Sequence, residues 1–179
     1  MNDVEDTFNH LQQHIQTTYG VEVNSRYETM NNPGDFNIAY ILEKFQINPE
    51  LFDSAHYRFV GPSVMQPQST DFMSQVDQSR PIVYVSLGTV FNQNIGFFNQ
   101  CFAALKDLDV SVIVSIGEAN NAADFDTVPD NVLLKSYVPQ TELLQHTALF
   151  LTHAGMNSTN EALLMDVPLL AFPQNADQP

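Results

Sequence analysis

Short apolar runs alternate with helical patterns along the second half of the chain. Five apolar runs predict buried strands: residues 81–88, 110–116, 131–137, 148–152 and 169–172. Three segments between them predict helices: residues 97–108, 141–146 and 158–165. Continuous apolar strands that alternate with helices are typical of a parallel sheet covered on both faces. We therefore predict an α/β fold in which the loops after the strands share one edge of the sheet.

The first 80 residues have a different pattern. Apolar side chains at helical spacing predict a helix that ends at Gly20: Phe8, Leu11, Ile15 and Tyr19. After the turn at residues 31–35, residues 36–42 are expected to form a buried strand and residues 56–63 another. Residues 65–80 are rich in Gln, Ser and Pro, as linkers are. We predict a first domain over 1–64, a linker over 65–80 and a second domain over 81–179.

The chain is strongly acidic, with 6 Lys and Arg against 21 Asp and Glu and a formal net charge of −15. Nucleic acids and anionic membranes are poor partners for such a chain, because both are bound through Lys and Arg. An anionic ligand must be held by local dipoles and a few donors. No apolar run approaches a membrane span, and the acidic start is not a signal peptide, so we expect a cytoplasmic protein.

The sequence offers little support for a metal or a bound cofactor. The lone Cys101 excludes an internal disulfide and gives no support for a thiolate metal cluster. His10 and His14 lie four residues apart on the predicted helix, a spacing that binds metals, but no third ligand is near. Solvent-facing side chains are the simpler interpretation, so we expect neither metal nor cofactor.

Two short polar turns follow predicted strands. SLGT at residues 86–89 could reach a phosphate or a sugar, or be a tight turn chosen for its backbone geometry; it is not the dinucleotide fingerprint. The turn after residue 152 carries His153, Gly155, Asn157 and Ser158 into a helix. Backbone N–H groups and the helix dipole make such a turn suitable for a phosphate.

A structural interpretation of the second turn is also open. Ser158 and Glu161 have the spacing of a capping box, in which Ser158 is the N-cap and Glu161 reaches back to a free N–H. Alternatively, Glu161 could accept hydrogen bonds from a ribose diol. Likewise, His153 could be a satisfied histidine, and Asp177 with Gln178 an ordinary turn. Their joint occurrence in one order favours the functional interpretation.

Several motifs occur together in a fixed order: SLGTVFN, VPQ, LLQH, THAGMNS, the glutamate of NEA, VPLLAFP and ADQ. With RFVGPS and the segment that begins NNPGDFN, they resemble the UDP-dependent glycosyltransferases of the GT-B fold. Among these, the chain is most similar to the bacterial macrolide-type enzymes. The resemblance covers nearly the whole chain from about Asn31 and implies two Rossmann-like domains around a cleft.

The resemblance implies a role for each matching residue. Val138 and Gln140 lie where the family holds uracil, partly through the backbone, and Tyr137 stands where plant members often have a stacking Trp. Glu161 matches the carboxylate that accepts from the ribose hydroxyls. The phosphate contacts fall to four residues: His153, Gly155, Asn157 and Ser158. Asp177 and Gln178 match the pair that bonds hydroxyls of the donor sugar. Gly88 and Thr89 match the first loop facing the donor and acceptor.

One position departs from the family pattern. Asp166 stands where the family usually has Gly before Val-Pro. If that position needs a left-handed backbone, Asp tolerates it better than most residues. We therefore expect little damage from the departure.

The implied chemistry is inverting, metal-independent transfer of a sugar, with a glucose-like donor, to a hydroxyl of a small hydrophobic acceptor. The family's base is a histidine near the start of the N-terminal domain, and the first residues here align with a late helix. We therefore assign no catalytic residue in this chain, and His10, His14 and His56 are not the base. The chain is expected to be a fragment, incomplete at both ends, that binds UDP-sugar without turning it over.

Two alternatives remain. One is an inactive nucleotide-binding remnant, or a subunit whose missing half comes from another chain. The other is a UDP-sugar epimerase, against which Gln140 and the Asp177–Gln178 pair argue. In the fragment, strands from residues 36–63 would expose their edges and apolar faces and favour self-association.

Overall fold

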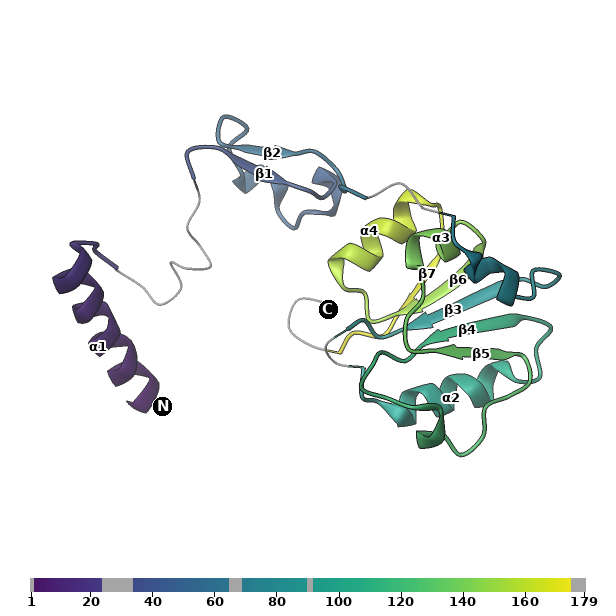
Figure 1. Ribbon diagram of the computed structural model, residues 1–179. Coiled ribbons are helices and arrows are strands. Elements are labelled where there is room, and N and C mark those ends of the chain that lie inside the picture. Colours follow the sequence, from purple (N-terminus) through teal and green to yellow (C-terminus); the bar gives the residue numbers. More distant parts are fainter. Residues whose placement is uncertain (1, 24–33, 65–68, 90–91, 175–179) are drawn as a thin grey trace. The chain divides into compact units, whose positions relative to one another are not determined.

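The computed structural model describes residues 2–23, 34–64, 69–89 and 92–174. The chain divides into two compact units (Figure 1). The first unit comprises residues 1–39 and 43–60, and the second unit comprises residues 40–42 and 61–179. The α/β class is confirmed by the second unit, which contains a parallel sheet with helices on its faces.

The first unit contains the predicted helix and two short strands. Helix α1 (Asn2–Tyr19) ends at Gly20, which has a φ of +68° and donates its N–H to the Gln16 carbonyl at 3.0 Å. Strands β1 (Asn37–Ala39) and β2 (Tyr57–Phe59) form a parallel pair, with the 3-10 helices η1 (Glu43–Phe45) and η2 (Pro49–Leu51) between them.

Burial of the first strand was predicted wrongly. Ile38 at the centre of β1 is 52% exposed, and its apolar neighbours Phe36 and Tyr40 are exposed as well. The physical reason is that β1 pairs with β2 alone, so within this unit no layer of apolar side chains closes over it. Phe52, which follows η2, packs edge-on against Tyr57 and Phe59 of β2, with ring centroids 5.1 and 5.7 Å apart.

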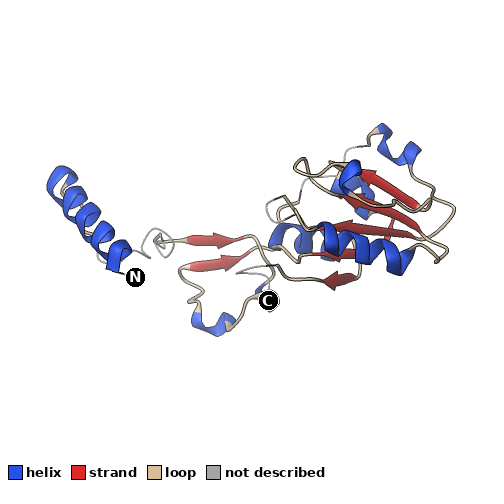
Figure 2. Cartoon of the chain, turned by 90° about the horizontal axis from the view of Figure 1, so that it is seen from below, coloured by secondary structure: helices blue, strands red, loops and turns tan. Residues whose placement is uncertain are grey.

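The second unit is built on five parallel strands in the order β5-β4-β3-β6-β7. Their bounds are β3 Ile82–Ser86, β4 Ser111–Ser115, β5 Val132–Lys135, β6 Thr147–Thr152 and β7 Leu169–Ala171. Helix α2 (Ile95–Leu105) covers one face of the sheet, and α3 (Gln140–Leu144) and α4 (Met156–Leu164) cover the other (Figure 1). Figure 2 shows the same helices in blue and the strands in red, seen from below. Two 3-10 helices complete the unit, η3 Asp71–Gln75 and η4 Ala122–Asp124. Each element predicted here from the sequence is present.

The central strand explains why the sheet forms. All five residues of β3 are buried, and alternate side chains point to opposite faces. Tyr84 joins one buried cluster with Ile113 and Phe150, and its ring stacks on that of Phe150 at 4.5 Å. Val83 and Val85 join the other cluster, which includes Phe98 of α2. A strand apolar throughout therefore supplies two cores at once.

Part of the segment from 65 to 80 is packed rather than extended. Phe72 and Val76, in and after η3, are buried in the cluster that contains Tyr84. Thr70 caps η3 and also donates its N–H and hydroxyl to Glu142 of α3, at 2.9 and 2.6 Å. The domain boundaries at 64 and 80 stay a prediction, but residues 70–76 belong to the folded second unit.

Candidate functional site

Loops that carry most of the predicted site residues meet at the carboxyl edge of the sheet. Strands β3 and β6 are neighbours, and Ser86 pairs with Thr152 at their carboxyl ends. The turn at 87–89 and the turn at 153–155 therefore emerge side by side (Figure 1). The loop after β5 leads through Pro139 into α3.

His153 fits between two glycines. A Cβ on Gly88 would lie 2.6 Å from Cε1 of the His153 ring, and a Cβ on Gly155 would lie closer still to Nε2. Real Cβ atoms do not approach so closely, so either substitution would displace the imidazole. Gly88 also has a φ of +79°, a conformation that favours glycine. The two glycine matches of the sequence analysis thus have one steric role, which is to make room for the histidine.

The backbone beside His153 is strained. Ala154 has a φ of +64°, in the left-handed region that costs a non-glycine residue about 1–2 kcal/mol. Its N–H donates to the Thr152 hydroxyl at 3.3 Å, which holds the turn. Such strain is concentrated at functional sites, because it persists only where the surrounding structure enforces it.

The N-terminus of α4 is left without a side-chain cap. Gly155 is the N-cap and the helix begins at Met156, so Ser158 lies inside the first turn and the capping-box interpretation is wrong. In contrast, the N-terminus of α2 is capped by Asn94, whose side chain accepts from the Phe97 N–H at 3.0 Å. The first N–H groups of α4 carry the positive end of the helix dipole and suit an anion.

Glu161 is held by Gln140 instead of by its own helix end. The Gln140 Nε2 atom donates to Glu161 Oε2 at 2.7 Å and to Ser158 Oγ at 3.1 Å. The Gln140 Oε1 atom accepts from the Tyr84 hydroxyl at 3.1 Å. Three predicted site residues are therefore joined in one network by direct hydrogen bonds, and a fourth residue, Tyr84, was missed. Its sequence signal is a single hydroxylated ring among the Ile and Val residues of β3.

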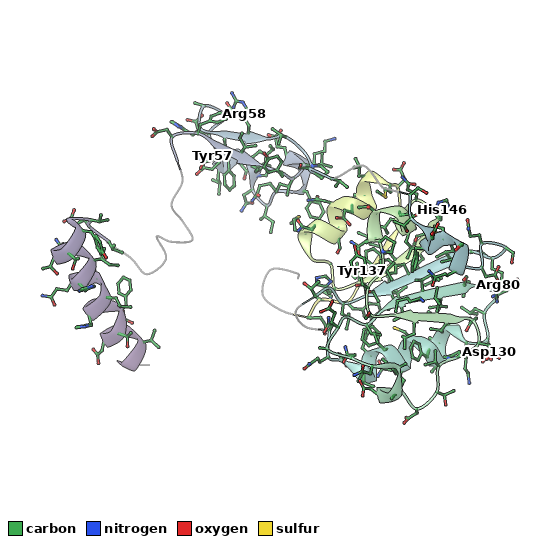
Figure 3. All side chains as sticks on the ribbon, in the orientation of Figure 1. Tyr57, Arg58, Arg80, Asp130, Tyr137 and His146 are labelled. Atoms are coloured by element: carbon green, nitrogen blue, oxygen red, sulfur yellow. The ribbon has the colours of Figure 1, made fainter. Side chains whose placement is uncertain are left out.

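The other predicted site residues are described by their exposure alone. Val138 is 3% exposed and belongs to the core, so only its backbone faces the edge. Tyr137 beside it is 74% exposed (Figure 3). Thr89 and Asn157 are exposed near Gly88 and Ser158. Asp177 and Gln178 lie outside the described residues, so their predicted role with the donor sugar stays a prediction.

A second network that sequence reasoning missed supports the first turn. Asn92 donates to the Gly88 carbonyl at 3.0 Å, and Asn120 donates to the Asn92 and Ile116 carbonyls at 2.9 and 2.7 Å. Both asparagines are buried. Gly117 has a φ of +76°, and a Cβ there would collide with the Asn92 amide. The loop after β4 thus fixes the Gly88 turn that contacts His153.

Asp166 has the conformation that the family pattern suggested. Its φ is +55°, so a left-handed residue is required between α4 and β7. Asp and Asn tolerate this region better than other non-glycine residues. The left-handed backbone considered for this position is therefore present, and the expectation that Asp166 causes little damage stays a prediction.

Titratable groups near the sheet are held neutral by burial. Burial raises the pKa of Tyr84 above its usual range, more than the hydroxyls of Ser86 and Ser115 lower it. Tyr84 is therefore a hydrogen-bond donor at neutral pH. Burial also raises the pKa of the Cys101 thiol to about 11, so this cysteine is not a thiolate. Among the described residues, no group of three His, Cys, Asp or Glu side chains could hold a metal ion.

A cavity of about 380 Å³ lies at the opposite, amino edge of the sheet. It is lined in part by Arg80 and His146, at the starts of β3 and β6 (Figure 3). Arg80 is already bound to Asp77 at 2.7 and 2.9 Å, so its charge is locally neutralised. The cavity has none of the predicted site residues, and we do not assign the function to it.

Comparison with known proteins identifies the family that this chain resembles. Residues 99–179 match the family described as "Erythromycin biosynthesis protein CIII-like, C-terminal domain". An uncharacterised UDP-glucosyltransferase, YojK, of Bacillus subtilis is 34% identical over 97% of the chain and 43% of its own length. The NDP-glycosyltransferase YjiC of Bacillus licheniformis is 39% identical over 85% of the chain and 39% of its own length. The chain thus spans less than half the length of these relatives.

Solved structures agree on the fold. The glycosyltransferase of kitacinnamycin superposes with a TM-score of 0.82 over 96% of this chain and 44% of that one, at 24% identity. UGT2 of Phytolacca americana, solved with UDP-2-fluoro-glucose and pterostilbene, superposes with a TM-score of 0.52 over 70% of this chain and 32% of that one, at 26% identity.

Fold and relatives together define the class: the chain is related to the UDP-dependent glycosyltransferases of the GT-B fold. Its relatives also include the demethyllactenocin mycarosyltransferase of Streptomyces fradiae, which is 35% identical over 80% of the chain and 30% of its own length. The resemblance found in the motifs is thereby confirmed. No helix in the described part of the chain is long and apolar enough to cross a membrane.

Proposed function

We propose that the second unit binds the nucleotide of a UDP-sugar at its carboxyl edge. We further propose that the protein transfers the sugar, which is glucose-like, to a hydroxyl of a small hydrophobic acceptor with inversion. No metal or cofactor takes part in this proposal, and the UDP-sugar is a co-substrate. A cytoplasmic location and the roles of Asp177 and Gln178 with the donor sugar are part of the same proposal.

One observation carries the proposal: His153 lies between Gly88 and Gly155, directly before the uncapped N-terminus of α4. The imidazole therefore lies next to the start of α4, whose first N–H groups have no partner within the helix and no side-chain cap. A diphosphate is the ligand that such an arrangement favours, since the donors are fixed and the helix dipole adds positive potential. This local field is needed because the net charge of the chain is −15.

The remaining residues have complementary roles in this proposal. The loop backbone at Val138 and Gln140 holds uracil, while Glu161 accepts hydrogen bonds from the ribose hydroxyls. Asn157 and Ser158 add their N–H groups to the phosphate turn. As the glycosidic bond breaks, negative charge accumulates on UDP, and the His153 ring with the α4 N-terminus stabilises that charge.

The proposal gives this chain the donor half of the reaction. In GT-B relatives the base is expected in an N-terminal region that this resemblance does not reach. Base catalysis and correct placement of the acceptor together account for large rate factors. We therefore propose that the chain by itself binds UDP-sugar and transfers no sugar.

Thermal melting with and without UDP and UDP-glucose tests the donor site. A ligand at about a hundred times its dissociation constant adds roughly 2.7 kcal/mol of stability. We expect UDP to raise the melting temperature of the chain and of Glu50→Ala, which alters an exposed glutamate in η2. The rise should be smaller in Glu161→Ala, which loses the ribose contact and keeps the phosphate turn. A cooperative melt that ignores UDP in the unaltered chain would reject the donor site.

We also propose that the β1–β2 pair self-associates through its exposed edges, since unpaired strands are templates for pairing. Analytical ultracentrifugation of the chain and of an Ile38→Lys variant tests this. Concentration-dependent association in the chain, weakened in the variant, supports the proposal. A monomer at all concentrations contradicts it.

A further inference from the structure

We propose that Tyr84 is a positioning residue for ribose recognition, acting through Gln140 on Glu161. The inference rests on the proposed UDP site and deepens it. Tyr84 itself lies inside the sheet and does not reach the ligand. Its hydroxyl holds the Gln140 amide in one orientation, and that amide holds the carboxylate that meets the ribose.

The hydroxyl of Tyr84 is the buried end of the hydrogen-bond network. The residue is 2% exposed at the centre of β3, and its ring is locked against Phe150 at 4.5 Å with an interplanar angle of 14°. A buried tyrosine hydroxyl needs a partner, and here it donates to Gln140 Oε1 at 3.1 Å. The position of this donor is therefore set by the core of the sheet.

The side-chain amide of Gln140 links the Tyr84 hydroxyl to the Glu161 carboxylate. With Oε1 accepting from Tyr84, the Nε2 atom faces α4, and its two hydrogens go to Glu161 Oε2 at 2.7 Å and Ser158 Oγ at 3.1 Å. The reversed amide would place Oε1 against the Glu161 carboxylate and Nε2 against a hydroxyl that already has donor character. Three hydrogen bonds thus specify one orientation.

The carboxylate of Glu161 is held by Gln140 through the Oε2 atom. Within the described part of the chain, Oε2 accepts from Gln140 and no hydrogen bond to Oε1 is found. Glu161 is half-buried, so its second oxygen is available at the edge of the sheet. A carboxylate fixed in this way can accept from a ribose diol and can distinguish ribose from 2′-deoxyribose.

The test compares UDP and 2′-deoxy-UDP binding by isothermal titration calorimetry. A hydrogen bond to a charged group predicts that the unaltered chain prefers UDP by about tenfold or more. In Tyr84→Phe the preference should fall by about threefold, since the ring stays packed while the amide loses its anchor. In Glu161→Ala the preference should disappear, and adding Tyr84→Phe to that variant should change nothing further.

A matched control separates positioning from general loosening of the core. Ile113→Val alters the same buried cluster without touching Gln140. It should lower the melting temperature and leave the UDP preference intact. The inference is overturned if Tyr84→Phe keeps the full preference, if Ile113→Val loses it equally, or if Tyr84→Phe acts equally in the Glu161→Ala background.

A ligand-free measurement distinguishes failure of this inference from failure of the UDP site. The side-chain amide resonances of Gln140, assigned by their loss in Gln140→Met, should shift or broaden in Tyr84→Phe and not in Ile113→Val. Unchanged resonances would refute the role of Tyr84 even if UDP binds. If the unaltered chain binds neither nucleotide, the ribose role falls with the proposed function, whatever the resonances show.

Discussion

The two parallel strand pairs β1–β2 and β3–β6 were both predicted from apolar runs, but their surroundings are very different. Every residue of β3 is buried, whereas Ile38 at the centre of β1 is half-exposed. The second pair lies inside a five-stranded sheet with a cluster on each face, and the first pair is a sheet of two strands. Apolar patterning thus predicts where a strand forms, but burial depends on how many neighbours it has.

The two units should differ most in the free energy of unfolding that is lost when an aromatic side chain is truncated. Phe98→Ala in α2 removes a fully buried ring and should lower the free energy of unfolding by about 3–5 kcal/mol. Phe45→Ala in η1 removes a ring that is 47% exposed, and the change should stay within about 0.5 kcal/mol. Urea unfolding followed by circular dichroism measures both. Equal losses would show that the first unit has a core of its own.

Two glycines with similar backbones sharpen the comparison. Gly88 and Gly20 both have a φ near +70° to +80°, but a Cβ meets His153 at the first and nothing within 4 Å at the second. Alanine at either position brings about 1–2 kcal/mol of backbone strain. Gly88→Ala should add about 1–3 kcal/mol of overpacking and weaken UDP binding.

Calorimetric melting and UDP titration of Gly88→Ala and Gly20→Ala separate the strain from the clash. The Gly20 variant is the control for strain alone and should bind UDP normally. If Gly88→Ala is no worse than Gly20→Ala, the close approach of His153 is not rigid.

A smaller effect is expected at two left-handed residues. Asp166 has a φ of +55° in the second unit, and Asn48 has a φ of +51° in the first. Asp166→Ala should lower the free energy of unfolding of the sheet by about 1 kcal/mol, because alanine tolerates this region less well. Asn48→Ala should leave the unfolding of the sheet unchanged. A loss in both variants would mean that the two units unfold together.

The smallest effect is a pH dependence in the second unit. Hydrogen bonds from the Thr70 hydroxyl and N–H lower the pKa of Glu142 below its ordinary value of 4.5. The stability from this contact is therefore present above about pH 4.5 and is lost as the pH falls through the lowered pKa.

Melting temperatures between pH 3 and 7 measure this dependence. Glu142→Gln should be less stable than the unaltered chain at pH 7, and the gap should narrow toward pH 3. A gap that stays constant with pH would assign the difference to packing.

Most of the second unit could be predicted because its signals are local. Five apolar runs gave the strands, and the glycine-rich turns gave the edge at which the site lies. The start of α4 could not be predicted correctly, since Ser158 and Glu161 have capping-box spacing. Only the structure shows that Gln140, 21 residues from Glu161, takes over this carboxylate.

Long-range contacts explain the other differences. The packing of residues 70–76 depends on Glu142 in α3. The burial of β1 depends on how many strands pair with it, and the sequence pattern does not give that number. From the sequence, Tyr84 is an ordinary core residue, and only the structure shows that its hydroxyl donates to Gln140. Sequence periodicity therefore does not predict which side chains far apart in sequence contact each other.

The glycine–histidine–glycine arrangement also restricts the order in which its members can change during evolution. A side chain at position 155 avoids the clash only after residue 153 has lost its ring, and a side chain at position 88 then still has the strain of a φ of +79°. A lineage that replaces either glycine first passes through a crowded intermediate, whereas one that replaces the histidine first does not. The three positions should therefore be inherited together, and when the site decays in a descendant, position 153 should be the first of them to change.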